Sequence, residues 1–249
     1  MTSFFLALQF LTTLSLKIEG FSGRRIAWSL VYFPVVGCLL AALLIGLNSL
    51  LIILGISQVV TNIILVIFLI ILTGGMHLDG LADTTDALLS GKEKKEMLEI
   101  MRDPHVGVMG VLSLISIMLL KVVLLSSVSI FFKPIALFLM CILSRWSVVL
   151  IMYLFPYARE EGKAKLFIQG LTFKIFATSL AITATFSFVV WDLPGLLVFL
   201  IIAGCVYLGN KVISKKLGGV TGDTLGATME LTEVTVLFIV CIMQRMING

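Results

Sequence analysis

Residues 74–110 read GGMHLDGLADTTDALLSGKEKKEMLEIMRDPHVGVMG. Their first five residues are the last five of a 53-residue run, 26–78, that has no Asp, Glu, Lys or Arg. Three carboxylates then follow within eight residues: Asp79, Asp83 and Asp86. Spacings of four and three place them on one face of a helix, within roughly 60° of arc. The stretch therefore predicts an acidic helix that directly adjoins a membrane-embedded segment.

The composition is that of a membrane protein. The 249 residues are 59% hydrophobic and 13% charged, with a mean hydropathy of +1.15, whereas soluble domains are about 45–50% apolar and about 25% charged. We predict an all-α, polytopic integral membrane helical bundle that forms one domain, 1–249. The net charge of +4 is explained by membrane topology, so we expect the lipid bilayer and no nucleic acid as a partner.

About seven transmembrane helices are expected, and an N-terminal apolar stretch, 3–16, precedes them. That stretch is shorter than the roughly 20 residues of a full crossing, so we expect a re-entrant or interfacial helix, with a true span as the alternative. No cleaved signal peptide is expected. The predicted spans are 26–55, 60–76, 108–130, 134–156, 175–191, 194–211 and 226–245.

The basic residues indicate an orientation. If the loop 17–25 is cytoplasmic and the spans alternate, four inner segments hold 14 of the 18 Lys and Arg residues, as the positive-inside rule requires. These segments are 17–25, 91–107, 157–174 and 211–218. We therefore expect the protein in the plasma membrane, with its chemistry facing the cytoplasm.

The acidic face is a candidate metal site. Like charges at helical spacing repel one another, and a divalent cation between them reverses that effect. Mg²⁺ takes oxygen ligands, usually one or two carboxylates together with phosphate oxygens and water. We predict that Asp79, Asp83 and Asp86 bind Mg²⁺; a solvated amphipathic helix on the membrane surface is the alternative.

A second acidic motif resembles the first. Residues 218–233 read GGVTGDTLGATMELTE, and both motifs fit GG-x-x-x-D-x-L-x-x-x-x-[DE], which aligns Asp79 with Asp223 and Asp86 with Glu230. We predict that Asp223 and Glu230 are metal ligands too, in two half-sites that meet around shared cations. Chance similarity in glycine-rich membrane sequence is the competing explanation.

Four cations and two histidines are candidates for substrate contacts. Lys121 and Arg145 fall inside otherwise uncharged spans, where a charge is functional or paired; they bind phosphate or form ion pairs with the acidic clusters. Arg102 and Arg159 lie in loops, where they clamp phosphate or set topology. The histidines, His77 and His105, are candidates near the first acidic motif, and a structural hydrogen-bonding role is the alternative. We assign His77 and Asp83 as candidate catalytic residues. The candidate substrate-binding residues are Arg102, His105, Lys121, Arg145 and Arg159.

Three segments carry a resemblance to a known family. They are HLDGLADTTDALL at 77–89, EIMRDPHVGVMGVLSL at 99–114 and GGVTGDTLGATMELTEVTVL at 218–237. They strongly resemble the cobalamin synthase family, the adenosylcobinamide-GDP ribazoletransferases, and the similarity runs through nearly the whole chain.

The resemblance implies an activity. A ribose hydroxyl of α-ribazole, or of its 5′-phosphate, would attack the cobinamide-linked phosphorus of adenosylcobinamide-GDP, GMP would leave, and Mg²⁺ would be required. It also implies that the five carboxylates named above hold the cation and that the four cations meet phosphates.

Two other functions fit parts of the pattern. An intramembrane prenyltransferase also binds Mg²⁺-pyrophosphate with Asp-rich motifs on two helices, although the second motif here lacks the matching D-x-x-x-D. A transporter would line its substrate path with Lys121 and Arg145. A homo-oligomer is compatible with the sequence.

Overall fold

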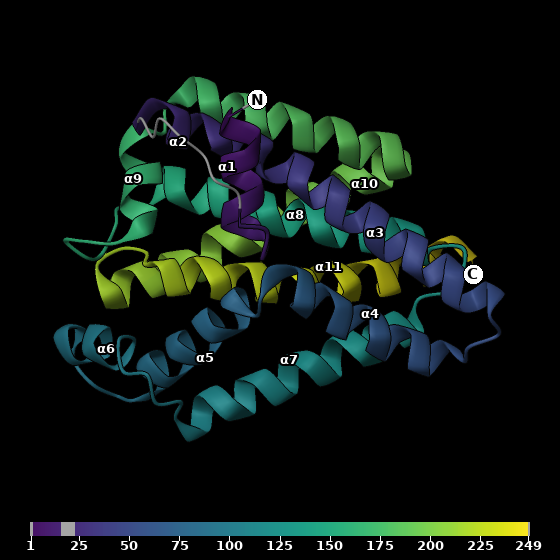
Figure 1. Ribbon diagram of the computed structural model, residues 1–249, viewed down its shortest axis with the longest axis horizontal. Coiled ribbons are helices and arrows are strands. Elements are labelled where there is room, and N and C mark those ends of the chain that lie inside the picture. The colour runs from purple at the N-terminus through teal and green to yellow at the C-terminus, as the bar shows by residue number, and fades with distance from the viewer. Residues whose placement is uncertain (1, 16–22, 249) are drawn as a thin grey trace.

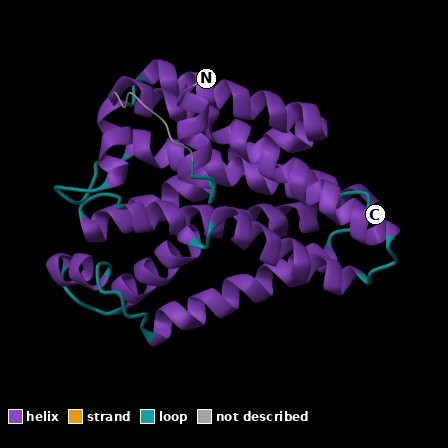
Figure 2. Ribbon diagram, viewed as in Figure 1, coloured by secondary structure: helices purple, strands orange, loops and turns teal. Residues whose placement is uncertain are grey.

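The regular structure of residues 2–15 and 23–248, the part of the chain that the computed structural model describes, is helical apart from one isolated β-bridge (Figure 2). Part of the predicted inner segment 17–25 lies outside the described residues. The elements are α1 (Thr2–Leu11), α2 (Gly23–Ser29), η1 (Leu30–Tyr32), α3 (Phe33–Ile53), α4 (Gln58–Thr73), α5 (Met76–Leu89), α6 (Lys94–Ile100), α7 (Val108–Ser127), α8 (Lys133–Leu154), α9 (Lys163–Gly170), α10 (Phe173–Leu217) and α11 (Gly222–Asn248).

Five helical segments of the described residues are long and apolar enough to cross a membrane, and the bent pair α4–α5 is a sixth. One of the five, α10, has 45 residues and leaves helical geometry at Trp191 and Asp192. At about 1.5 Å per residue, α10 would be far longer than a roughly 30 Å bilayer core if it were straight. Counting its two halves separately gives the predicted seven spans, and the all-α membrane bundle is confirmed.

Helix α8 occupies the centre of the bundle. Of its apolar 18-residue window, 89% is buried inside the protein, and it packs against α3, α10 and α11. A helix that is apolar on every face is either enclosed by protein or exposed to lipid, and α8 is of the enclosed kind. The polar residues that α8 does carry, among them Arg145, are therefore enclosed by other helices.

The acidic helix α5 begins at a sharp bend. Gly74 and Gly75 both have positive φ, 68° and 70°, which glycine adopts without steric cost, and α4 and α5 meet there at 91°. The backbone N–H of Thr13 donates to the carbonyl of Leu72 at 2.9 Å. This bond ties the segment after α1 to the bend. Helix α1 itself lies across the long axis of the bundle (Figure 1), as expected of a re-entrant or interfacial helix.

The loops gather at two ends of the bundle. In Figure 1 the end at the left carries α6, α9 and the start of α11, and the other end carries the 54–57 and 128–132 connections and the C-terminus. Three of the predicted inner segments, 91–107, 157–174 and 211–218, thus lie at one end. The acidic helix α5 runs toward that same end.

Candidate active site

The two acidic segments converge where α5 crosses the start of α11. A Cβ on Gly80 would lie 2.6 Å from the carbonyl oxygen of Asp223, and a Cβ on Gly226 would lie 3.1 Å from the Cα of His77. Only glycine permits such an approach of two backbones. Gly80 and Asp223 are 143 positions apart in the sequence. The two distant motifs therefore lie side by side in the fold.

Local hydrogen bonds fix the first turn of α11. The N–H of Thr224 is 3.2 Å from the hydroxyl of Thr221, and the N–H of Thr221 donates back to the hydroxyl of Thr224 at 2.8 Å. This reciprocal arrangement satisfies backbone donors that a helix start leaves unpaired. It fixes the position of Asp223, which lies between these two threonines in the sequence.

A loop from the end of α8 brings a cation to Asp223. The N–H of Val220 donates to Pro156 at 2.8 Å, and the N–H of Ala158 donates to Val220 at 2.9 Å. The loop is thereby held beside the start of α11. Arg159 follows, and its Nη2 lies 2.8 Å from Oδ2 of Asp223, so these two predicted site residues are paired with each other.

The three carboxylates of α5 differ in their surroundings. Asp79 is exposed and Asp83 is half-buried. The negative charges of Asp79 and Asp223 repel an ionised Asp83, and the positive charge of Arg159 attracts it. Asp86, in contrast, accepts the backbone N–H groups of Gly107 at 2.7 Å and Gly110 at 2.8 Å. Asp86 therefore caps the start of α7, where anions are stabilised by free N–H groups and the helix dipole.

A cavity of about 290 Å³ adjoins the acidic residues. His77, Asp79 and Asp223 line its polar side, and Phe10 and Met229 belong to its apolar wall. His77 is 6% exposed, and its Nε2 has no hydrogen-bond partner among residues 2–15 and 23–248. A buried, unpaired ring nitrogen is costly, and the charges that act on this ring are those of Arg145, Glu233 and Lys121.

The donor set suits Mg²⁺ in its chemistry. Among the described residues, no three His, Cys, Asp or Glu side chains already form a metal-binding group. Mg²⁺ needs only one or two carboxylates when phosphate and water supply its other ligands. Asp79, Asp83 and Asp223 provide such carboxylates. In this structure the carboxylate of Asp223 forms an ion pair with Arg159.

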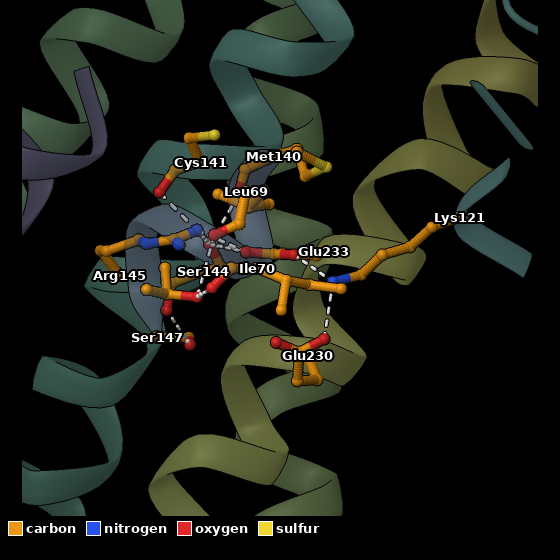
Figure 3. Close-up of polar contacts among 11 residues, drawn as sticks. Leu69, Ile70, Lys121, Met140, Cys141, Ser144, Arg145, Ser147, Glu230 and Glu233 are labelled. Atoms are coloured by element: carbon orange, nitrogen blue, oxygen red, sulfur yellow. Dashed lines mark hydrogen bonds and ion pairs between the residues drawn. The ribbon is translucent and has the colours of Figure 1, made fainter. Parts of the chain in front are cut away.

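Glu230, predicted as a metal ligand, lies in a separate buried network of charges (Figure 3). Nζ of Lys121 is 2.6 Å from Glu230 Oε2 and 2.5 Å from Glu233 Oε2, and Glu233 also pairs with Arg145. All four side chains are at most 6% exposed. The network has two cations and two anions and is neutral overall. This geometry favours the ion-pair alternative for Lys121 and Arg145.

The loop residues Arg102 and His105 lie outside the cavity beside Asp79. His105 is exposed, and its Nδ1 is 2.6 Å from Asp103; the N–H of His105 also donates to Asp103 and holds the pKa of that carboxyl below its ordinary value. Arg102 lines a second cavity, of about 300 Å³, together with Lys95 and Arg159.

Three residues of these sites were not singled out as site candidates from the sequence. Lys95 belongs to a charge-mixed stretch typical of exposed helix. Tyr157 lines the first cavity, and its only signal is its position two residues before Arg159. Glu233 links Lys121 to Arg145, and its position one turn beyond Glu230 was the available signal.

Comparisons with known proteins identify a family. The family model described as cobalamin-5-phosphate synthase, CobS, matches residues 3–241. An adenosylcobinamide-GDP ribazoletransferase of Desulforamulus reducens is 35% identical over 242 residues, which cover 96% of each chain. The protein of the same name from Thermoanaerobacter pseudethanolicus is 39% identical and covers 93% of this chain and 94% of its own. One from Escherichia coli O45:K1 is 34% identical, with 94% of this chain and 97% of its own covered.

No solved structure matches this fold. The family model spans nearly the whole chain and includes both acidic motifs, and the similar relatives share one name. The chain belongs to the CobS family, the cobalamin-5-phosphate synthases.

Proposed function

We propose that this membrane enzyme joins adenosylcobinamide-GDP to α-ribazole, or to its 5′-phosphate, and releases GMP. The names of its relatives support this activity. The structural observation that carries the proposal is the contact of Gly80 with Asp223. It brings the carboxylates of two helices to one cavity, in a chain of this family.

The reaction exchanges a phosphoanhydride bond for an ester bond at phosphorus. A ribose hydroxyl oxygen of α-ribazole forms a bond to the cobinamide-linked phosphorus, and the bond from that phosphorus to the bridging oxygen breaks. GMP leaves with the electron pair, and the hydroxyl proton is lost. Such transfers depend on positioning and on neutralising the phosphate charge.

Mg²⁺, when bound, supplies charge neutralisation at the phosphate oxygens. We propose Asp79, Asp83 and Asp223 as its protein ligands, a smaller set than the sequence suggested. Asp86 already accepts two backbone N–H groups, and Glu230 is paired with Lys121. These engagements make both of them less suited to a metal site.

The remaining residues bind and orient the substrate. Arg159 has a planar guanidinium with several donors, which suits a bidentate contact to phosphate. When Arg159 contacts the substrate, Asp223 loses its ion-pair partner and becomes available to the cation. His77 lines the same cavity, its Nε2 has no hydrogen-bond partner among the described residues, and it is the candidate to hold the hydroxyl or take its proton.

The location follows from the spans and the charges. We propose that the protein lies in the plasma membrane with the α6 and α9 end in the cytoplasm. The 91–107, 157–174 and 211–218 segments at that end carry 11 Lys and Arg residues, and cytoplasmic loops are the ones enriched in such residues. The family assignment favours this transferase over the prenyltransferase and transporter alternatives.

A direct assay tests the activity. Purified protein is incubated with adenosylcobinamide-GDP, α-ribazole and Mg²⁺, and GMP is measured by chromatography. We expect GMP and the joined corrinoid in equal amounts, and little of either from an Asp83→Asn variant. Absence of GMP with the wild-type protein would contradict the proposed function.

A further inference from the structure

The loop segment 157–160 separates two cavities. Tyr157 lines the cavity that contains His77 and Asp79, whereas Ala158 and Glu160 line the second one. The bridge between Tyr157 and Val220 holds the start of this segment beside the start of α11. Arg159 has the length to reach both cavities and lines both.

The two cavities differ in chemistry. The first one, beside the acidic residues, has apolar walls from Phe10, Leu225 and Met229. The second one lies against α6 and is lined by charges: Lys95, Arg102 and Arg159 as cations, with Glu99 and Glu160 as anions. We call them the apolar cavity and the α6 cavity. Their volumes are similar, about 290 and 300 Å³.

A displacement at phosphorus needs two compartments. The attacking and leaving oxygens are roughly in line on opposite sides of the phosphorus, so the nucleophile and the leaving group occupy separate spaces. Each cavity is at the lower end of the roughly 300–1,000 Å³ typical of small-molecule pockets. Each therefore takes one nucleoside, and the far larger corrinoid remains outside both.

We propose, on the basis of the proposed function, that the α6 cavity binds the leaving GMP half and the apolar cavity binds the α-ribazole base. Arg159 then contacts the phosphoryl group that passes between them. Lys95 and Arg102 bind the phosphate of GMP, because cations form strong hydrogen bonds with phosphate. The apolar walls suit the aromatic base of α-ribazole.

The carboxylates of the α6 cavity provide the preference for guanine. The N1–H and N2–H groups of guanine are hydrogen-bond donors, and an ionised carboxylate only accepts. Glu99 and Glu160 are the carboxylates that line this cavity. Adenine presents an acceptor at N1 and is not matched by a carboxylate there.

The first experiment measures binding of GMP with Mg²⁺ to the purified full-length protein by calorimetry. The double variant Lys95→Gln/Arg102→Gln is expected to weaken GMP binding about tenfold or more, since it removes two charge-assisted hydrogen bonds. Its affinity for α-ribazole is expected to stay unchanged. Lys92→Gln is the matched control, because Lys92 is exposed and pairs with Glu96 at 3.7 Å outside the cavity.

The second experiment blocks the other compartment. Gly222 lines the apolar cavity, and a Cβ there meets nothing within 4 Å. Gly222→Leu therefore adds a side chain at the lining of the cavity without a clash at Cβ. We expect it to weaken α-ribazole binding about tenfold and to leave GMP binding unchanged, with Gly222→Ala as the control for the backbone change.

The third experiment tests base recognition. Glu99→Gln and Glu160→Gln are compared with the wild-type protein for binding of GMP and AMP. At least one of them is expected to reduce the preference for GMP about tenfold, because a neutral amide accepts these bonds less strongly.

The outcomes separate this inference from the proposed function. If the wild-type protein releases no GMP, the function itself is wrong. If GMP is released but Lys95→Gln/Arg102→Gln leaves GMP binding unchanged, or Gly222→Leu weakens GMP rather than α-ribazole, the assignment of the compartments is overturned. A variant that does not fold is replaced by its single substitutions, Lys95→Gln and Arg102→Gln, which are judged by the same criterion.

Discussion

Two charged centres share helix α11, and they handle charge in opposite ways. In the network of Lys121, Arg145, Glu230 and Glu233, every charge has a partner and at most 6% of any side chain is exposed. Asp79 and Asp83 have no cation of their own on α5, and Asp79 is exposed. The first centre is therefore complete by itself, whereas the second is the one where we propose that a cation from outside binds.

The largest expected effect is a loss of stability on breaking the buried network. Glu233→Gln removes an anion shared by Lys121 and Arg145, and leaving a buried charge unpaired costs about 3–5 kcal/mol. The free energy of unfolding, measured by denaturation in mixed micelles, should fall accordingly. Asp103→Asn, in an exposed pair with His105, should leave it unchanged. Equal stability of Glu233→Gln and the wild type would show that the network is not structural.

The acidic face should show the reverse behaviour. Asp79→Asn and Asp223→Asn are expected to reduce the rate of GMP release by about 10²–10³, the range seen when one charge-stabilising group is removed from an active site. The stability of Asp79→Asn should stay the same or rise, because a like charge is removed, whereas Asp223→Asn also loses the partly exposed ion pair with Arg159 and should change stability by about 1 kcal/mol or less. Loss of folded protein in these variants, with activity per folded molecule intact, would place the aspartates among the structural charges.

The contact between the two helices gives a smaller effect. Gly80→Ala forces α5 away from Asp223, since its Cβ would lie 2.6 Å from a carbonyl oxygen, and such overpacking costs about 1–3 kcal/mol. Both stability and GMP release should decrease. Gly46→Ala is the matched control, because a Cβ at Gly46 meets nothing within 4 Å and alanine favours the helix. A neutral Gly80→Ala would contradict the close crossing.

The smallest effect is expected at Asp86. Asp86→Ala removes the acceptor for two backbone N–H groups at the start of α7, a change comparable to the loss of a helix cap at about 0.5–2 kcal/mol. Activity should fall less than in Asp79→Asn. If Asp86→Ala were as inactive as Asp79→Asn at equal stability, Asp86 would be a metal ligand as the sequence predicted.

Much of the fold could be predicted from the sequence. Long uncharged runs indicate membrane spans, and loops rich in Lys and Arg indicate one common side of the membrane. The predicted spans therefore begin and end close to the observed helices. The bend at Gly74-Gly75 and the lateral approach of α1 depend on tertiary contacts such as the bond from Thr13 to Leu72. Those contacts join distant segments and have no local signal.

The site was predicted in part. The repeated glycine-acid motif indicated that Asp79 and Asp223 lie together, and Gly80 against Asp223 confirms that the segments converge. Spacing alone could not assign different roles to Asp223 and Glu230, because the two residues share a helix face. The difference arises because Lys121 of α7 reaches Glu230, and the rotation of one helix against another is set by packing.

Binding of Mn²⁺, measured by electron paramagnetic resonance with adenosylcobinamide-GDP present and α-ribazole absent, tests the central claim most directly. The account predicts that Asp79→Asn and Asp223→Asn weaken Mn²⁺ binding about tenfold or more, while Glu230→Gln binds it as the wild type does. Loss of the ion in Glu230→Gln, with full binding in both aspartate variants, would contradict the account.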